Sequence, residues 1–262
     1  MKAILICSNP NAYHSDPAPN PESTRLSENG SKLNQFLCVA SFAEYAVVPA
    51  SGAVVIPKEM PLDRAALLSC AVLTGYGAVV NTAKVQPGSS VAVFGCGGVG
   101  LSAVAIAKAF GAKVAAVDVN EIALENARQL GADFLLQSEV AVSEIQSLGG
   151  ADISVDALGS QVTAELSIKS LRRLGKHIQL GLLLSESGLT PIAMARVIAW
   201  ELEIIGSHGM AARDYPAMLS MIESGKLNPT KFIKKIITLE EAPRALQNMD
   251  SQIQDGITII IP

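Results

Sequence analysis

The sequence predicts an α/β fold built on a doubly wound, parallel, six-stranded sheet, with an incomplete barrel-like unit contributed by both ends of the chain. Short apolar runs alternate with longer segments whose apolar residues recur three and four positions apart, as strands and helices do in a parallel sheet. A cluster of glycines separates the first of these runs from the helical segment after it. The predicted strands are residues 91–95, 113–119, 134–137, 153–158, 177–181 and 202–207, with five helical segments between them.

The segment after the first strand illustrates the helical pattern. Val99, Ala103, Ile106 and Phe110 fall on one stripe of a helix, whereas Lys108 lies off that stripe. We expect the stripe to pack on the sheet.

The regions on either side of the sheet follow a different pattern. Residues 42–49 and 53–57 are β-prone runs bounded by prolines and glycine, and Asp63 is expected to cap the helix that leads into Cys70. After Gly209, residues 214–225, 232–239, 240–249 and 257–261 predict helix, strand, helix and strand. The chain therefore divides into a flexible arm over 1–30, whose residues 9–30 are rich in Asn, Pro and Ser, a barrel-like unit from 31–70 and 211–262, and a sheet domain over 71–210.

Composition and charge exclude several classes of protein. Of the 262 residues, 49% are hydrophobic and 17% are charged, which suits a well-buried globular protein and excludes disorder for most of the chain. A net charge of −4 argues against a nucleic-acid partner. The uncharged stretches 65–83 and 85–107 are interrupted by glycines, and the N-terminal apolar run is too short for a signal peptide, so we expect a cytoplasmic protein with no membrane partner.

The four cysteines, Cys7, Cys38, Cys70 and Cys96, contain no Cys-x-x-Cys pair. Their spacing therefore predicts neither a zinc knuckle nor a redox pair, and free thiols are expected.

The glycine cluster carries the strongest functional signal. Residues 95–100 read Gly-Cys-Gly-Gly-Val-Gly, follow a predicted strand directly and open a predicted helix, and Asp118 stands near the end of the next strand. Strand, glycine turn, helix, strand and acid at about 20 residues form the complete dinucleotide-binding (Rossmann) fingerprint. The predicted cofactor-binding residues are Gly95, Gly97, Gly98, Val99, Gly100 and Asp118, together with Leu158 and Gly181 at the ends of the fourth and fifth strands.

Each position of this motif has a physical role. Gly95 allows the tight turn, Gly97 lets the backbone approach a pyrophosphate, and Gly100 lets the helix sit close to the sheet. Asp118 would accept hydrogen bonds from the adenosine ribose hydroxyls, and its charge would repel a 2′-phosphate, so the motif favours NAD over NADP. The alternative is a glycine-rich turn that binds no ligand.

Beyond this motif, the chain resembles the medium-chain dehydrogenase/reductase superfamily, and most closely its zinc-type alcohol dehydrogenase branch. The resemblance covers about residues 25–262. It rests on the segments 41–49, 68–78, 95–100, 131–133, 206–207, 224–227 and 239–243.

The resemblance implies a fold, an activity and several site residues. It implies a Rossmann domain beside a barrel-like (GroES-like) catalytic domain, and NAD(P)-dependent hydride transfer between an alcohol and an aldehyde or ketone. Cys70 corresponds to a ligand of the catalytic zinc, and Thr74 and Val99 correspond to residues near the nicotinamide, so Cys70 and Thr74 are the predicted catalytic residues. A homo-oligomer that pairs through residues 202–207 is also implied.

Much of the family's N-terminal catalytic domain has no counterpart before Phe42. The other catalytic zinc ligands, the cysteine cluster of the structural zinc and the hydroxyl residue that relays the alcohol proton are all missing there. A catalytic zinc needs about three protein ligands. Cys70 is the one identifiable ligand, since His14, His177, His208 and Cys38 stand in segments better suited to solvent, packing or cofactor contact.

Several functions therefore remain open. The first is a zinc-type alcohol dehydrogenase, and the second is a zinc-free reductase that uses NADPH, against which Asp118 and Cys70 both argue. The third is a non-catalytic nucleotide-binding or interaction protein, and the fourth is a gene fragment without a function of its own. If the barrel is incomplete, the strands over 42–49 and 53–56 would expose unpaired edges that another subunit would cover.

Overall fold

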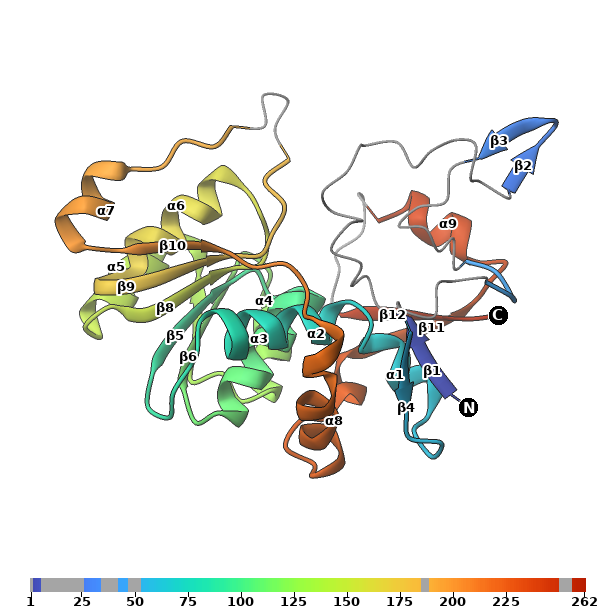
Figure 1. The fold of residues 1–262 in the computed structure, drawn as a ribbon. Helices are drawn as coiled ribbons and strands as arrows, with labels where there is room; N and C mark the ends of the chain where they lie inside the picture. Colours follow the sequence, from blue (N-terminus) through green and yellow to red (C-terminus); the bar gives the residue numbers. More distant parts are fainter. Residues whose placement is uncertain (1, 6–25, 34–41, 47–52, 185–188, 250–255) are drawn as a thin grey trace.

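The structure, a computed structural model, describes residues 2–5, 26–33, 42–46, 53–184, 189–249 and 256–262 (Figure 1). Its main feature is a six-stranded parallel sheet with the strand order β10-β9-β8-β5-β6-β7. The chain moves outward from β5 in both directions, so the sheet is doubly wound, as predicted. Its strands are β5 (Ser90–Phe94), β6 (Lys113–Asp118), β7 (Phe134–Gln137), β8 (Ala151–Asp156), β9 (Leu171–Gln179) and β10 (Glu203–Gly206).

Helices cover both faces of this sheet. Alternate residues of β5 point to opposite sides: Val91 and Val93 join one hydrophobic cluster with α3 and α4, while Ala92 and Phe94 join another with α5 and α6. Because both of its faces are buried, the central strand β5 reads as a continuous apolar run. None of the helices in the described ranges is long and apolar enough to cross a membrane. The five connecting helices are α3 (Gly98–Ala109), α4 (Glu121–Gln129), α5 (Ser138–Ser147), α6 (Gln161–Ser170) and α7 (Met194–Trp200).

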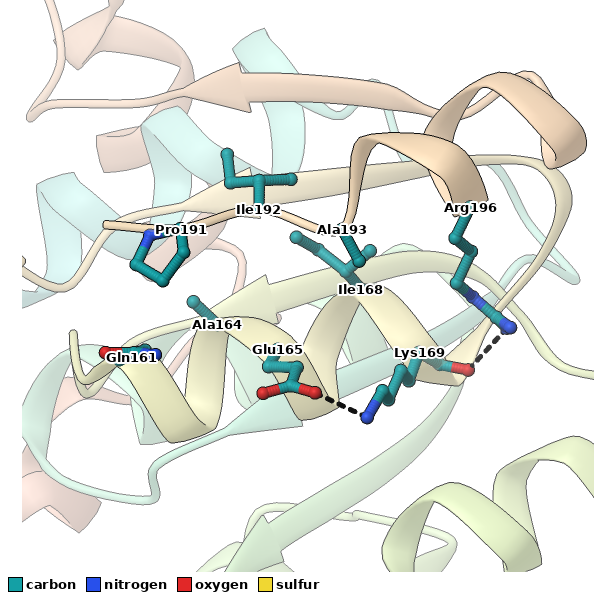
Figure 2. Close-up of a pocket in the computed structure, with 9 residues that line it drawn as sticks. All are labelled: Gln161, Ala164, Glu165, Ile168, Lys169, Pro191, Ile192, Ala193 and Arg196. Atoms are coloured by element: carbon teal, nitrogen blue, oxygen red, sulfur yellow. Dashed lines mark hydrogen bonds and ion pairs between the residues drawn. The ribbon is translucent and has the colours of Figure 1, made fainter. Parts of the chain in front are cut away.

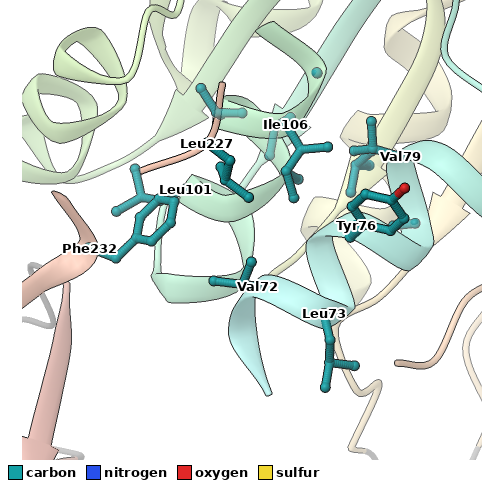
Figure 3. Packing of buried hydrophobic residues seen from close by; sticks show 14 of the residues in the cluster. Val72, Leu73, Tyr76, Val79, Leu101, Ile106, Leu227 and Phe232 are labelled. Atoms are coloured by element: carbon teal, nitrogen blue, oxygen red, sulfur yellow. The ribbon is translucent and has the colours of Figure 1, made fainter. Parts of the chain in front are cut away.

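Helix α3 is buried on more than the predicted stripe. Ala103 and Ile106 are fully buried as expected, but Leu101, Val104 and Ala107 are buried as well. A second helix, α2 (Ala71–Tyr76), packs against α3, and side chains from both helices join Leu227 and Phe232 in one hydrophobic cluster (Figure 3). A Cβ on Gly75 of α2 would lie 2.8 Å from the Cβ of Ser102, so the small residue permits the close crossing.

The remaining elements come from both ends of the described chain and lie beside the Rossmann sheet (Figure 1). β1 pairs antiparallel with β4, β2 with β3, and β11 runs parallel to β12. The predicted tail of helix, strand, helix and strand is confirmed. The bounds are β1 (Lys2–Leu5), β2 (Leu26–Glu28), β3 (Ser31–Leu33), β4 (Ala53–Ile56), α1 (Leu62–Leu67), the π-helix η5 (Gly77–Thr82), the short helices η6 (Ala212–Asp214) and η7 (Pro229–Phe232), α8 (Tyr215–Glu223), β11 (Ile233–Thr238), α9 (Ala242–Gln247) and β12 (Ile257–Ile261).

Three local expectations differ from the structure. The segment expected to be a flexible arm carries β1 near its start and β2 near its end, where pairing with β4 and β3 supplies hydrogen bonds that composition does not reveal; most of the arm lies outside the described residues. The strand predicted over 42–49 is wrong over 42–46, because no strand of the described residues pairs with that stretch and Tyr45 is 90% exposed. Residues 47–49 lie outside the description.

The expected cap of α1 is the third difference. Pro61, at φ −60°, precedes the helix, so Asp63 falls inside the first turn and does not cap it. Its carboxylate instead accepts a bond from the backbone N–H of Arg64 at 2.8 Å.

Candidate cofactor-binding site

The glycine loop joins β5 to α3 with little space to spare. Gly95 has φ +88°, a left-handed conformation that favours glycine, and its N–H donates to the carbonyl oxygen of Val117 at 2.9 Å. A Cβ on Gly100 would lie 1.8 Å from the carbonyl oxygen of Gly95, so the helix starts in direct contact with the turn. Gly97 is exposed, and a Cβ added to it would have no neighbouring atom within 4 Å. The loop is thus closed toward the sheet and open toward solvent, as a cradle for a phosphate would be.

Asp118 ends β6 and holds this loop. One carboxylate oxygen accepts a bond from the N–H of Cys96 at 2.6 Å, and the other accepts a bond from the N–H of Asn120 at 2.9 Å. Asp118 remains partly exposed, and each carboxylate oxygen has a further lone pair for a ligand hydroxyl. The acid that the sequence assigns to the ribose therefore also supports the glycine turn.

Cys96 is a packing residue in this loop. The side chain is buried, and its Sγ lies 3.7 Å from the carbonyl oxygen of Val117. Burial raises the pKa of the Cys96 thiol strongly, and the charge of Asp118 raises it further. The thiol is therefore protonated at neutral pH and is not a candidate nucleophile or metal ligand.

Leu158 and Gly181 lie at the same end of the sheet as the glycine loop. A Cβ on Gly95 would be 3.1 Å from the Cβ of Leu158, whose side chain is 62% exposed. A Cβ on Gly181 would be 2.1 Å from the backbone nitrogen of Gly159, so these two loops cross in contact. The carboxyl ends of β5, β8 and β9 thus meet at the point where the strand order reverses, which is where open α/β sheets bind ligands.

The remaining predicted residues lie where α2 approaches the glycine loop. A Cβ on Gly98 would be 3.7 Å from the Cβ of Ala71 and 2.8 Å from Cγ1 of Ile257 in β12. Val99, partly buried, packs against the main hydrophobic cluster. Cys70 is exposed just before α2, and Thr74 follows it by one helical turn, with its N–H bonded to the carbonyl oxygen of Cys70 at 3.0 Å.

Two hollows join this region to the C-terminal strands. One, of about 940 Å³, extends from Gly97 and Gly98 to β11, α9 and β12, and it includes the cations Lys235 and Arg244. The other, of about 430 Å³, is lined by Cys70. Ile257 borders both hollows, so the glycine loop and Cys70 face neighbouring spaces.

A third hollow, of about 310 Å³, lies between α6 and the segment leading into α7 (Figure 2). Its charged groups already have protein partners: Lys169 pairs with Glu165, and Arg196 donates to the carbonyl oxygen of Lys169 at 2.9 Å. The guanidinium of Arg196 also lies 3.8 Å from the ring centre of Trp200. The charged side chains of this hollow thus bind other parts of the protein, so we do not consider the hollow a candidate site for the dinucleotide.

Cys70, which the resemblance implies as a zinc ligand, has no complete ligand set around it in the described part of the chain. No three His, Cys, Asp or Glu side chains there stand close enough to hold a metal ion together. A catalytic zinc takes about three protein ligands. The described residues therefore do not fit a zinc site; Cys38 and His14 lie outside them.

Sequence reasoning missed one group of polar residues at this edge of the sheet. Asp156 ends β8 and is fully buried, and it bonds both to the loop after β8 and to Gln179 of β9. His177, for which the sequence leaves both cofactor contact and packing open, is buried in the same network. The available signal was a polar residue at every second position of two neighbouring strands, 154 and 156 beside 177 and 179.

Comparisons with known proteins agree with this geometry. The zinc-binding dehydrogenase family profile matches residues 98–224. Alcohol dehydrogenase class-2 isozyme 2 of Oryctolagus cuniculus is 30% identical over 233 residues, and alcohol dehydrogenase 6 of Rattus norvegicus is 31% identical over 240 residues. These matches cover 86% and 87% of this chain but 62% and 63% of the relatives, so the chain spans a little under two thirds of their length.

Solved structures give the same result. Benzyl alcohol dehydrogenase from Acinetobacter calcoaceticus superposes with a TM-score of 0.81 at 28% identity, over 90% of this chain and 67% of that one. A cobalt- and zinc-bound thermostable alcohol dehydrogenase from Pyrobaculum aerophilum superposes with a TM-score of 0.72 at 28% identity, over 84% and 63%. The Rossmann sheet, the glycine loop and these relatives together show that most of the chain is similar to the zinc-type alcohol dehydrogenases of the medium-chain dehydrogenase/reductase superfamily, and that residues 98–224 match the zinc-binding dehydrogenase family.

Proposed function

We propose that this chain binds NAD(H) along the carboxyl edge of its Rossmann sheet and acts as an oxidoreductase on a small alcohol or carbonyl substrate. The observation that carries the proposal is the bond from the N–H of Cys96 to Asp118, which ties the ribose-binding acid to the glycine loop. Gly97, open to solvent at the start of α3, offers backbone N–H groups and a positive helix end to the pyrophosphate.

The cofactor, when bound, supplies the hydride that converts a carbonyl to an alcohol, or accepts it in the reverse direction. The residues of this chain bind and orient the two reactants. Asp118 would hold the adenosine ribose, and the exposed Leu158 with Gly181 would form one wall for the nicotinamide. Cys70 and Thr74 are our candidates for the substrate side, since a spacing of four residues brings them to one side of α2. No step is assigned to zinc, because the described donors do not fit it.

Titration with NADH and NADPH tests the cofactor assignment. Nicotinamide fluorescence of the wild-type chain should show saturable NADH binding and weaker NADPH binding, because a 2′-phosphate would face the Asp118 carboxylate. Asp118→Asn should weaken NADH binding about tenfold and reduce the preference for NADH over NADPH. Asn is a better probe than Ala, because it keeps an acceptor for the Cys96 N–H. Glu121→Gln, which removes an exposed acid in the first turn of α4, is the matched control and should bind as wild type does.

Failure to bind either dinucleotide by folded protein would overturn the proposal. A preference for NADPH would instead support the zinc-free reductase, to which Asp118 is unfavourable.

A second candidate function is dinucleotide binding without turnover. The observation that favours it is that no three His, Cys, Asp or Glu side chains in the described ranges stand close enough to hold a metal ion. The two candidates differ in one measurement: a chain that binds NADH but reduces no aldehyde or ketone of a broad panel is a binding protein.

We also infer that copies of the chain associate through β10. This strand ends the sheet, and no residue of the neighbouring α7 is buried. The segment between β9 and β10 contains Leu182, Leu184, Leu189 and Ile198, which are 64% to 88% exposed, and exposed apolar side chains of this kind are typical of a surface that another chain covers. Sedimentation velocity should give a dimer or larger species; a monomer at all concentrations would exclude it.

A further inference from the structure

Asp156 is a fully buried carboxylate at the carboxyl end of β8. Its Oδ1 accepts bonds from the N–H groups of Leu158 and Gly159, both at 3.0 Å. Its Oδ2 accepts bonds from Nε2 of Gln179 at 3.0 Å and from the Thr163 hydroxyl at 3.2 Å. No Lys, Arg or His of the described residues forms an ion pair with it. Such a group is tolerated because donors surround it, and the three contacts with N–H groups require an acceptor.

The donors form a chain with a single direction. Both hydrogens of the Gln179 amide are used, one toward Asp156 and one toward the carbonyl oxygen of Gly181 at 2.9 Å. The amide oxygen must therefore face His177, so Nε2 of His177 carries the hydrogen of that 3.0 Å bond. Nδ1 of His177 is then an acceptor, and the hydroxyl of Ser167 in α6 donates to it at 2.9 Å. The chain runs from α6 through β9 to Asp156.

Asp156 connects the two loops that meet at this edge of the sheet. Its side chain holds the N–H groups of Leu158 and Gly159, and its backbone carbonyl accepts bonds from the N–H groups of Leu180 and Gly181, both at 2.9 Å. These bonds bring Gly159 and Gly181 into contact. They also leave Leu158 exposed beside Gly95 of the glycine loop.

The strand order determines which part of a dinucleotide would reach these loops. Asp118 ends β6 on one side of β5, and β8 and β9 lie on the other side. A dinucleotide with its adenosine ribose at Asp118 and its pyrophosphate on the loop after β5 must place its nicotinamide toward β8 and β9.

We propose that Asp156 is a positioning residue, whose carboxylate fixes the Leu158–Gly159 loop and the Gly181 turn as the wall of the nicotinamide site. The proposal rests on the proposed function, since it presumes that NAD(H) is the ligand. A positioning role differs from a general role in stability, because its loss weakens the binding of the nicotinamide half of the cofactor and not of the adenosine half.

Asp156→Asn tests this selectivity. Asn has nearly the same shape but replaces one acceptor oxygen with a donor, so at least one pair of donors loses its partner. The binding of NADH and of ADP-ribose, which lacks the nicotinamide, should be compared by calorimetry. We expect NADH to weaken about tenfold, the equivalent of one unmet buried donor, with ADP-ribose nearly unchanged.

Asp152→Asn is the matched control. Asp152 lies on the same strand but near its other end, where its partly exposed carboxylate accepts bonds from Ser90 and from Arg172, with which it forms an ion pair. Asp152→Asn should change the affinities for NADH and for ADP-ribose by the same factor, or change neither. If Asp156→Asn does not fold, Gln179→Met removes the donor to Asp156 and Gly181 and should reproduce the selective loss.

Equal weakening of both ligands, or no change in either, would overturn the positioning role while leaving the proposed function intact. A wild-type chain that binds neither ligand would overturn the proposed function, and the positioning role with it.

Discussion

Gly100→Ala should force the glycine loop and α3 apart. A Cβ at this position would lie 1.8 Å from the carbonyl oxygen of Gly95 and 2.9 Å from its carbonyl carbon. Both are backbone atoms of a turn that the bond from the Gly95 N–H to Val117 holds in place. No side-chain rotation can relieve the overlap, so the start of the helix or the turn must move.

The size of the effect follows from two opposing contributions. Overpacking of a tight contact costs up to about 3 kcal/mol, whereas the higher helix propensity of Ala over Gly restores at most about 1 kcal/mol. The net loss is about 2 kcal/mol, or roughly 4–8 °C in melting temperature for a chain of this size. Because the N–H groups of the first turn of α3 also move, NADH affinity should fall about tenfold or more.

Gly97→Ala is the matched control for this variant. Gly97 has φ −75° and ψ −172°, which any residue adopts, and no atom lies within 4 Å of its missing side chain. The melting temperature of Gly97→Ala should therefore equal that of the wild type. The added methyl group should obstruct the approach of a pyrophosphate and so weaken NADH binding. Calorimetric melting and fluorescence titration measure the two effects. Unchanged melting of Gly100→Ala, or undiminished NADH binding by Gly97→Ala, would refute the assignment of these glycines.

Two further predictions concern buried polar groups. Tyr215→Phe removes the hydroxyl that donates to the carbonyl oxygen of Leu68 at 2.9 Å in the core, so urea unfolding should show a loss of about 1–2 kcal/mol, and equal stability would contradict that bond's contribution. Burial lowers the pKa of His177, although the bond to Gln179 and the charge of Asp156 oppose this. At a pH below about 6.5, the pKa of a histidine in the unfolded chain, the unfolded chain therefore takes up a proton that the folded chain resists. The free energy of unfolding then decreases as the pH decreases. Thermal melts between about pH 7.5 and 5.5 should show a smaller decline for His177→Gln than for wild type; identical declines would exclude this residue as a cause.

The sheet could be predicted because its central strands, β5 and β6 among them, are buried on both faces. Burial on two sides leaves continuous apolar runs such as 91–94, which stand out against the helical spacing around them. The strand predicted over 42–49 had a similar local pattern, but a strand also needs a partner, and pairing is a property of the whole chain. Local pattern therefore predicted β4 correctly and residues 42–46 incorrectly.

The Asp156 network could not be predicted from motif spacing for a related reason. Asp156 pairs with Gln179, and Ser154 with His177, only through the register of β8 against β9. Each partner stands 23 positions from the other in the sequence. Polar residues at alternate positions near the carboxyl ends of β8 and β9 were visible, but their connection depends on a register that the sequence does not state.

Asp118 shows why cofactor choice and loop shape are not independent in this chain. A motif assigns the acid to ligand recognition alone, and changing preference toward NADP then requires only its removal. Here the same carboxylate accepts the N–H of Cys96, in the middle of the glycine loop, at 2.6 Å. A substitution that removes the side-chain acceptor together with the charge leaves this partly buried donor without its partner, which costs about 1–3 kcal/mol. A variant that binds NADPH well must therefore keep or replace the acceptor of the Cys96 N–H, as well as make room for the phosphate.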